Sequence, residues 1–238
     1  MPSPETTPHA LEEELEAVYR LYAALARGRD PESGLGGKLL FAGELNPAAR
    51  RLIRAANIAG AASLAASADA AQARQEMRDG VLDFVVNSLD EALRILKNEI
   101  RKRQPVAVGV SLAPDAVVKE MEDRGVLPDL LPPAPPSVTA APEFAAFLAR
   151  GAQRIQQEPL PAAHKFLVVA VPPAWAQRQA AFDALLLDFL PTGDHINRRW
   201  LRISPRYLGT QARRVRSLEC DEEAASELLD RIGQSLPQ

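Results

Sequence analysis

The chain has 238 residues, of which 47% are hydrophobic and 25% are charged, and its formal net charge at pH 7 is −3. These values are typical of a globular protein without electrostatic attraction for polyanions, so we expect neither a nucleic-acid partner nor a membrane surface. Cys220 is the only cysteine, which excludes an internal disulfide and a cysteine-based zinc cluster. The start lacks signal-peptide features and no apolar run approaches the roughly 18 residues of a membrane span, so we expect a cytoplasmic protein.

Three parts follow one another along the sequence. Residues 1–9 are rich in proline and polar residues and are expected to form a disordered or loosely attached tail. Residues 10–142 predict an α/β domain with a Rossmann-like parallel sheet flanked by helices. Residues 143–238 predict a smaller α+β portion that contains antiparallel strands, either as a cap or as an extension of the main sheet.

In residues 36–131 short apolar runs alternate with amphipathic segments, the pattern of βαβ units that build one parallel sheet. The predicted helices cover residues 10–28, 47–58, 69–77, 89–103 and 114–124, and the predicted strands cover residues 39–41, 61–66, 83–86, 106–110 and 129–131. Asn46 can cap a helix that has Pro47 in its first turn. Ser88 and Glu91 form a capping box in which Glu91 reaches back to the amide of Ser88.

The C-terminal portion gives a less regular pattern. A proline-rich run, residues 132–136, cannot enter a sheet interior and marks the exit from the first domain, an edge or a rigid loop. After it we predict helices over residues 143–157, 174–189 and 222–232, and strands over residues 166–171, 200–203 and 215–220. The last two strands alternate between apolar and polar residues, which favours antiparallel pairing with one wet face.

Several short motifs keep a defined order across the first domain. They are Gly37-Lys38-Leu39, Ala55-Ala56-Asn57-Ile58-Ala59-Gly60, Ser88-Leu89-Asp90-Glu91-Ala92-Leu93, Val108-Gly109 and Arg124-Gly125-Val126-Leu127-Pro128-Asp129. The stretch from Gly37 to Asp129, about two fifths of the chain, resembles the nucleotide-binding domain of urocanase, an NAD-dependent lyase of histidine breakdown. Most of these residues are expected to be scaffold, because they cap helices and start strands.

The sequence departs from the family where the resemblance would place NAD. The family's loop Gly-Leu-Gly-Gly-Met-Gly-Gly-Ala-Gln lets backbone amides approach a pyrophosphate, but residues 44–52 here read Glu-Leu-Asn-Pro-Ala-Ala-Arg-Arg-Leu. Pro47 has no amide to donate, and Glu44 repels a phosphate, although Arg50 and Arg51 partly offset that repulsion. The Ala and Arg side chains also occupy the approach.

Three further departures point the same way. Ser67 stands where the family has the acidic residue that binds ribose hydroxyls, and Leu112-Ala113-Pro114 replaces a Gly-Asn-Ala turn. The proline run with Ser137 and Val138 replaces a polar Asp-Gln-Thr-Ser-Ala-His segment. We therefore expect no cofactor, no cofactor-binding residue and no hydration of urocanate.

No catalytic or metal-binding residue is predicted elsewhere. Cys220 lies among carboxylates that raise its pKa, which favours a structural thiol over a nucleophile. His9, His164 and His195 lack partners at the spacing of a helical metal site, and His195 beside Asp194 is interpreted as a surface turn residue.

Arginines crowd the last predicted strands beside Trp200 and Tyr207. They are Arg198, Arg199, Arg202, Arg206, Arg213, Arg214 and Arg216. Arginine beside aromatic residues suits nucleic acid or a phosphorylated ligand, but alternation along strands would divide these side chains between two faces. A solvated or subunit-interface surface is favoured.

Two functions remain open. The first is a urocanase-related protein without NAD binding or hydratase activity, which acts in binding or assembly, as a homodimer or with another protein. The second is a small-ligand enzyme or sensor, including a divergent urocanate hydratase-like lyase, that reuses the cleft at the carboxyl ends of the strands. The predicted lining of that cleft is Glu44, Asn46, Arg50, Ser67, Asn87, Ser111 and Asp115, with Arg50 as the partner of a small anionic ligand.

Overall fold

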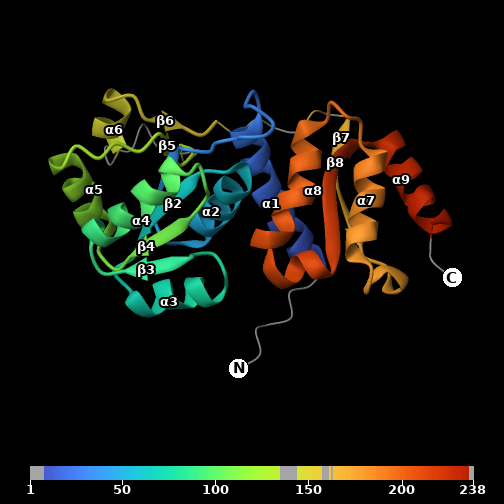
Figure 1. Cartoon of the computed structure of the whole chain (residues 1–238), viewed down its shortest axis with the longest axis horizontal. Coiled ribbons are helices and arrows are strands. Elements are labelled where there is room, and N and C mark those ends of the chain that lie inside the picture. The colour runs from blue at the N-terminus through green and yellow to red at the C-terminus, as the bar shows by residue number, and fades with distance from the viewer. Residues whose placement is uncertain (1–7, 135–143, 157–160, 162, 236–238) are drawn as a thin grey trace. The chain divides into compact units, whose positions relative to one another are not determined.

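The computed structural model describes residues 8–134, 144–156, 161 and 163–235. They form two compact units, one within Leu21–Gln157 and one that combines Met1–Arg20 with Glu158–Gln238. Helix α1 (Pro8–Ala26) contributes to both, and most of the predicted tail, residues 1–7, lies outside the described residues. Figure 1 colours the first unit mainly from blue to yellow and the second mainly orange and red.

The first unit contains a six-stranded sheet in the order β3-β4-β2-β1-β5-β6, and all of its strand pairs are parallel. Its strands are β1 (Leu39–Glu44), β2 (Ala62–Ala66), β3 (Phe84–Val86), β4 (Ala107–Val110), β5 (Leu130–Leu131) and β6 (Gln153–Arg154). The first five coincide with the predicted strands to within a few residues. The prediction of a Rossmann-like parallel sheet is therefore confirmed.

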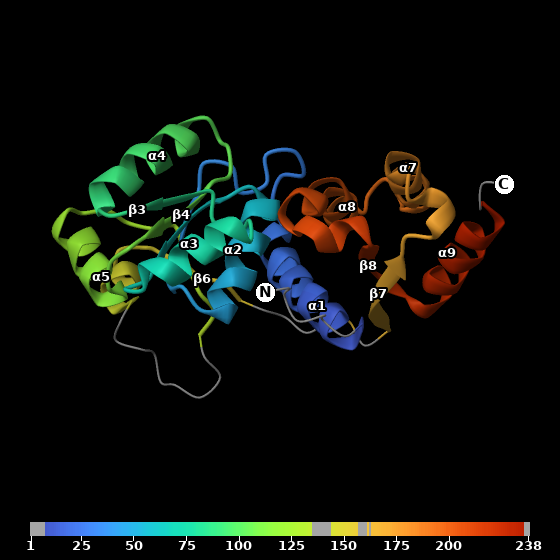
Figure 2. The ribbon, with the colours of Figure 1, turned by 90° about the horizontal axis from the view of Figure 1, so that it is seen from below.

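Helices connect these strands and cover both faces of the sheet. They are α2 (Pro47–Ala59), α3 (Ala70–Arg78), α4 (Leu89–Arg101), α5 (Pro114–Asp123) and α6 (Ala145–Ala149). The connections through α2 and α3 move along the sheet in one direction, and those through α4 and α5 move in the other. Because such crossovers are right-handed, α2 and α3 lie on one face and α4 and α5 on the other (Figures 1 and 2).

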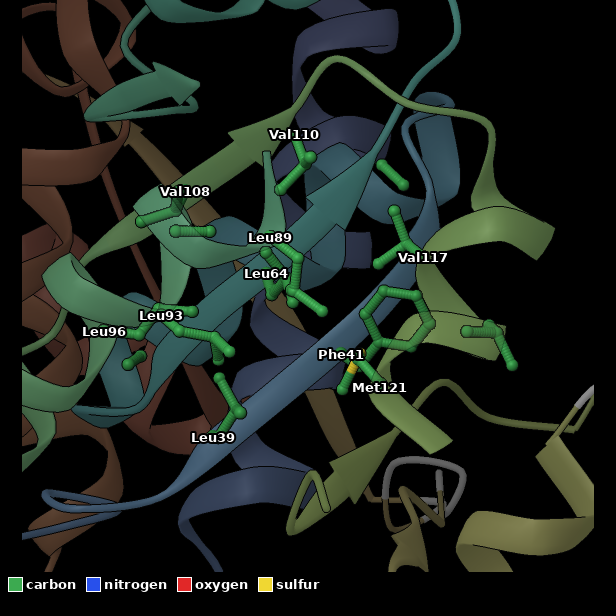
Figure 3. Packing of buried hydrophobic residues seen from close by; sticks show 14 of the residues in the cluster. Leu39, Phe41, Leu64, Leu89, Leu93, Leu96, Val108, Val110, Val117 and Met121 are labelled. Atoms are coloured by element: carbon green, nitrogen blue, oxygen red, sulfur yellow. The ribbon is translucent and has the colours of Figure 1, made fainter. Parts of the chain in front are cut away.

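The hydrophobic core on the α4 and α5 face joins side chains from every layer. Phe41, Leu64 and Val108 project from the strands toward Leu93 of α4 and Met121 of α5 (Figure 3). All five side chains are buried, with exposed fractions from 0% to 9%. Packing of this apolar surface is the main stabilisation of the sheet.

The predicted helix starts are present, with one change in the capping box. Asn46 Oδ1 accepts a hydrogen bond from the amide of Ala49, and Ser88 accepts one from the amide of Glu91. Glu91 reaches back as expected, but its carboxylate accepts from the amide of Asn87 (3.0 Å) in place of the amide of Ser88. The Glu91 carboxylate therefore satisfies the amide of the residue that precedes the cap.

The prediction of one helix over residues 143–157 is wrong for the described part of that range. Helix α6 ends after Ala149, Gly151 adopts a left-handed φ of +103°, and β6 follows as an edge strand parallel to β5. The glycine permits the reversal that returns the chain to the sheet. The main sheet thus continues past the predicted boundary at residue 142.

The second unit has two antiparallel strands, β7 (His164–Ala170) and β8 (Val215–Asp221), which confirms antiparallel strands near the C-terminus. Its other elements are a 3₁₀ turn η2 (Pro173–Trp175), α7 (Gln179–Phe189), α8 (His195–Tyr207), a 3₁₀ turn η3 (Gly209–Arg213) and α9 (Glu222–Gln234). The first part of α1 also belongs to this unit, since the ring of Tyr19 lies 5.1 Å from those of Phe166 and Trp200.

The predicted strand at residues 200–203 is wrong, because these residues lie within α8. Asp194 caps the helix by accepting from the amide of Asn197 (3.0 Å), and the buried residues Trp200, Leu201 and Ser204 follow helical spacing. The Trp-Leu-Arg-Ile run alternates in polarity over too few residues to distinguish a strand from a helix.

Candidate functional site

Two of the sequence motifs meet at the amino ends of neighbouring strands. Asp129 Oδ1 accepts from Lys38 Nζ over 2.8 Å, and its Oδ2 accepts from the amide of Leu39 over 2.9 Å. The amide of Asp129 donates in turn to the carbonyl of Leu39. The Gly-Lys-Leu and Pro-Asp motifs thus meet where β1 and β5 begin.

Asp83 makes the same arrangement at the start of β4. Its carboxylate accepts from the amide of Ala107 over 2.8 Å, and its own amide donates to the carbonyl of Ala107. A second motif, Val108-Gly109, is explained by packing, because a Cβ atom on Gly109 would lie 2.6 Å from Cδ1 of Leu82. Asp83 thus ties the start of β3 to the start of β4, at the ends of these strands opposite their carboxyl ends.

The turn after β1, which the resemblance aligns with the urocanase glycine-rich loop, is built here as a helix start. Asn46 Oδ1 lies 3.0 Å from the amide nitrogen of Ala49, and Pro47 occupies the first helical position. Phosphates bind helix starts through free first-turn amides. One of those amides is bonded to Asn46 and another is absent from Pro47.

Arg50, the predicted anion partner, is directed toward α3. Its Nε lies 2.9 Å from Oε2 of Glu76, and its Nη2 lies 3.6 Å from a carboxylate oxygen of Asp79. Glu76 is only 6% exposed, and burial raises its pKa, although the guanidinium of Arg50 opposes that shift. These ion pairs join α2 to α3 and occupy the Arg50 guanidinium.

Ser67, which the resemblance aligns with a ribose-binding position, is buried within a local network. Its hydroxyl donates to Gln72 Oε1 over 2.9 Å and accepts from the amide of Asp69 over 3.2 Å. Gln72 then donates to the carbonyl of Leu45 over 2.8 Å. The loops after β1 and β2 are therefore joined through Ser67 and Gln72.

The crevice of this doubly wound sheet lies between β1 and β5. The chain leaves β1 for α2 on one face, and after β5 it reaches α6, whose Phe147 belongs to the core on the opposite face. Ligands of open α/β sheets bind at such a switch point, outside the carboxyl ends of the strands. The crevice between β1 and β5 is therefore where a ligand of this fold is expected to bind.

An aromatic side chain that the sequence reasoning missed lies beside the end of β1. Phe144 is 6% exposed, and its ring centroid lies 5.9 Å from that of Phe41. A Cβ atom on Gly43, near the end of β1, would lie 3.5 Å from Phe144 Cζ. The guanidinium of Arg154 stands 5.5 Å over the Phe144 ring and donates to the carbonyl of Pro132 over 3.2 Å.

The other predicted cleft residues are placed at the carboxyl ends of different strands. Glu44 ends β1, Asn87 follows β3, Ser111 follows β4 and Asp115 lies in the first turn of α5. Within the part of the chain that the structure describes, none of these four side chains makes a hydrogen bond or ion pair. Two of the four are carboxylates, which repel an anion.

Cys220 is buried on β8, and burial, reinforced by the carboxylate of Asp221, raises the pKa of its thiol. His164 Nδ1 lies 2.9 Å from Glu219 Oε1 at the start of β7, and His195 is exposed at the start of α8. Among the described residues no cluster of His, Cys, Asp and Glu could hold a metal ion.

The arginines of the C-terminal portion lie on several elements, not on alternating strands. Arg198, Arg199, Arg202 and Arg206 are on α8, Arg213 ends η3, and Arg216 is buried on β8 in an ion pair with Asp183. Arg198 donates to the carbonyls of Leu187 and Leu190. The predicted division between two faces of a sheet is therefore wrong, because its residue 200–203 strand is a helix.

The comparison with known families agrees with the fold and with the motif positions. The urocanase Rossmann-like domain model matches residues 18–134, which include β1 to β5 and the helices between them. No helix among the described residues has the length and apolar character that crossing a membrane requires. Over residues 18–134, about half of the chain, this protein is thus similar to the urocanase Rossmann-like domain.

Proposed function

We propose that this protein is a urocanase-related scaffold that does not bind NAD and does not hydrate urocanate, and that it acts in binding or assembly as a homodimer. The observation that carries the proposal is the turn after β1. Asn46 uses the amide of Ala49, and Pro47 has none, so two donors that a pyrophosphate would need are missing. The helix start is built for stability.

The surroundings of this turn support the same reading. Arg50 is held by Glu76 and Asp79, and the Ser67 hydroxyl is held by Gln72, so neither is arranged for phosphate or ribose. A serine also lacks the carboxylate that accepts from both ribose hydroxyls. Binding of NAD would therefore require new phosphate and ribose contacts at several separate positions.

Phe144 adds a steric argument at the switch point. Its buried ring lies against Gly43 and under the Arg154 guanidinium, so aromatic and cationic groups of the chain itself occupy the neighbourhood of the β1 end. A dinucleotide would have to displace a ring that also packs on Phe41 and Phe147. Burial of a phenylalanine stabilises a fold by about 1.5–3 kcal/mol, which a ligand would have to offset.

Isothermal titration of the full-length protein with NAD tests the first part of this proposal. We expect no saturable heat at NAD concentrations up to about 1 mM, which corresponds to a binding free energy weaker than about −4 kcal/mol. A bacterial or other active urocanase run in parallel would show that the titration detects NAD. A saturable micromolar signal would overturn the proposal.

The absorbance of urocanate tests the second part. We expect no decrease when the protein is added, with or without NAD, whereas the active urocanase should consume the substrate under the same conditions. Conversion that scales with the concentration of this protein and disappears on heating would show that hydratase activity survives.

The small-ligand enzyme or sensor has weaker support, because Arg50 and Ser67 are engaged within the chain and Glu44 and Asp115 disfavour anions. Thermal-shift screening with nucleotides and small carboxylates separates it from the scaffold. A ligand at about 100 times its dissociation constant would add roughly 2.7 kcal/mol to the free energy of unfolding. A shift that Asn87→Ala or Ser111→Ala abolishes would favour this second function.

A further inference from the structure

The two edges of the β7–β8 sheet differ in how their backbone groups are used. On β8 the side chain of Asn197 binds the peptide groups of Glu219: the Glu219 amide donates to Asn197 Oδ1 over 3.0 Å, and Asn197 Nδ2 donates to the Glu219 carbonyl over 2.8 Å. The carboxamide of Asn197 thus takes the place of a neighbouring strand. It closes the outer edge of β8 at this residue.

This contact also fixes which residues of β7 point outward. Phe166 is the partner of Glu219 in the ladder, and because Glu219 turns its amide and carbonyl away from β7, the two form a non-hydrogen-bonded pair. Such pairs alternate with hydrogen-bonded ones along an antiparallel ladder. The peptide groups of Phe166 and Val168 therefore point to the edge of β7 that faces away from β8.

That edge of β7 has no strand partner among the described residues. The sheet contains β7 and β8 only, and no backbone hydrogen bond of Phe166 or Val168 toward the outer side occurs in the described ranges. In Figures 1 and 2 no labelled strand other than β8 lies beside β7. Leu167 and Val168 are half-buried, and the strand contains no proline or bulge that would prevent further pairing.

We propose that β7 pairs antiparallel with β7 of a second copy of this chain, which joins the two small sheets into one continuous sheet. Because the outward amide of His164 already donates to the carbonyl of Pro161, the overlap runs over residues 165–169. Overlap of this range with itself places the two-fold axis at Leu167 and sets Phe166 opposite the partner's Val168. Both residues present outward peptide groups, so this register satisfies them in hydrogen-bonded pairs. An interface of this kind is isologous, as two-fold symmetry requires.

The charges on β7 suit this register. Lys165 lies opposite the partner's Val169, so the two Lys165 residues stand four positions apart, about 14 Å along the sheet. That separation exceeds the screening length of about 8 Å at physiological ionic strength. His164 lies opposite Ala170, and the centre of the pairing is apolar. A second copy can therefore pair with β7 in this register without placing like charges in contact.

Sedimentation velocity across a concentration series measures the association of the full-length protein. We expect a dimer for the unmodified chain. Val168→Pro removes the outward amide in each copy but no bond to β8, because Val168 and Ser217 form a non-hydrogen-bonded pair, and it should raise the dimer dissociation constant at least about tenfold. Val168→Thr, which keeps the amide and the branched side chain, is the matched control and should associate like the unmodified protein.

Cysteine crosslinking provides a second readout that does not depend on a proline. In a Cys220→Ala background, Leu167→Cys would place two thiols opposite each other at the axis, with Cα atoms about 4.5 Å apart in a non-hydrogen-bonded pair. Ala170→Cys would place them about 20 Å apart. We expect a disulfide-linked dimer for the first variant and none for the second.

A monomer at every concentration, or equal crosslinking by the two cysteine variants, would overturn the pairing. If Val168→Pro fails to fold by circular dichroism, the cysteine pair decides. The pairing rests on the assembly role proposed above, but NAD titration and sedimentation are separate measurements, so a monomer would leave the absence of NAD binding standing.

Discussion

Asp129 accepts a hydrogen bond from the Lys38 ammonium group through Oδ1 and one from the Leu39 amide through Oδ2, and so ties the start of β1 to the start of β5. We predict that Asp129→Ala lowers the free energy of unfolding by about 1–3 kcal/mol, because the part-buried amide of Leu39 loses its charged acceptor. Urea denaturation of both proteins measures the difference.

Lys38→Met is the control for that prediction. The Lys38 side chain is 52% exposed, and exposed ion pairs contribute about 0–1 kcal/mol, so this variant should cost much less than Asp129→Ala. Equal losses in the two variants would mean that the ion pair, not the amide contact, carries the stabilisation.

The turn after β1 should respond to substitution as a helix start. Asn46→Ala should lower the free energy of unfolding by about 1 kcal/mol through loss of the cap on Ala49. Replacing residues 47–50 by glycines should cost more, on the order of 1 kcal/mol for each glycine in the helix interior, and should not create NAD binding. Chemical denaturation and NAD titration of the same samples test both statements; NAD binding by the glycine variant would contradict the importance assigned to Ser67 and Phe144.

Asn197 joins three elements of the second unit. Its Oδ1 accepts from the Tyr19 hydroxyl (2.8 Å) and the Glu219 amide, and its Nδ2 donates to Asp194 Oδ2 (2.7 Å) and the Glu219 carbonyl. Asn197→Ala should cost at least about 2 kcal/mol, because it deprives several buried polar groups of this partner. Tyr19→Phe, which removes one bond, should cost about 1 kcal/mol. Thermal and urea unfolding provide the comparison; a milder effect of the alanine variant than of Tyr19→Phe would contradict the central position of Asn197.

Cys220 should behave as a structural thiol. Because burial raises its pKa, little thiolate is present near pH 8, and we expect slow alkylation by iodoacetamide in the folded protein. Mass spectrometry should show rapid alkylation in urea. An Ala170→Cys variant supplies an exposed thiol on the same sheet as the control, and equal folded-state rates at the two positions would contradict the burial argument.

Glu76 should make stability depend on pH. Its pKa is raised in the folded protein above the ordinary value of 4.5, so the folded state binds the proton more tightly than the unfolded chain and stability falls as the pH rises through this window. Glu76→Gln removes that dependence, so the variant should gain relative to the unmodified protein between about pH 4 and about pH 7. Urea denaturation at about pH 4 and about pH 7 measures the free energy of unfolding of both proteins. If Glu76→Gln instead lost stability relative to the unmodified protein as the pH rises, attraction to Arg50 would outweigh burial.

The sequence predicts the first unit well because its signals are local. Asn46 and Pro47 mark the start of α2 by themselves, and Ser88 with Glu91 marks α4, whatever packs on those helices. The apolar strands between them are continuous and short, as buried parallel strands are. Fold class and the resemblance to the urocanase domain therefore follow from residues close together in the chain.

Features that depend on distant residues could not be predicted in this way. Nothing near Phe144 indicates that its ring will lie against Gly43, about one hundred residues earlier, and nothing near Arg50 indicates that it will bind Glu76. The seven predicted cleft residues lie at or after the carboxyl ends of β1 to β4, but burial and ion pairing, which local sequence does not indicate, determine which of their side chains are engaged within the chain. The sequence does not predict α8, because its capping residue Asp194 lies beside Gly193 and His195 in a run that also suits a surface turn.

Asp83 and Asp129 also determine which parts of this sheet can change in sequence without altering the alignment of its strands. Each carboxylate binds the first amide of a neighbouring strand, so a shift of pairing by one residue would break a charge-assisted hydrogen bond at the amino edge. The alignment of the strands is thus set at their amino ends, opposite the carboxyl ends where ligands of this fold bind. Loops at the carboxyl ends can therefore differ, as residues 44–52 differ from the glycine-rich loop of the urocanase domain that this unit resembles, while the alignment of the strands stays the same.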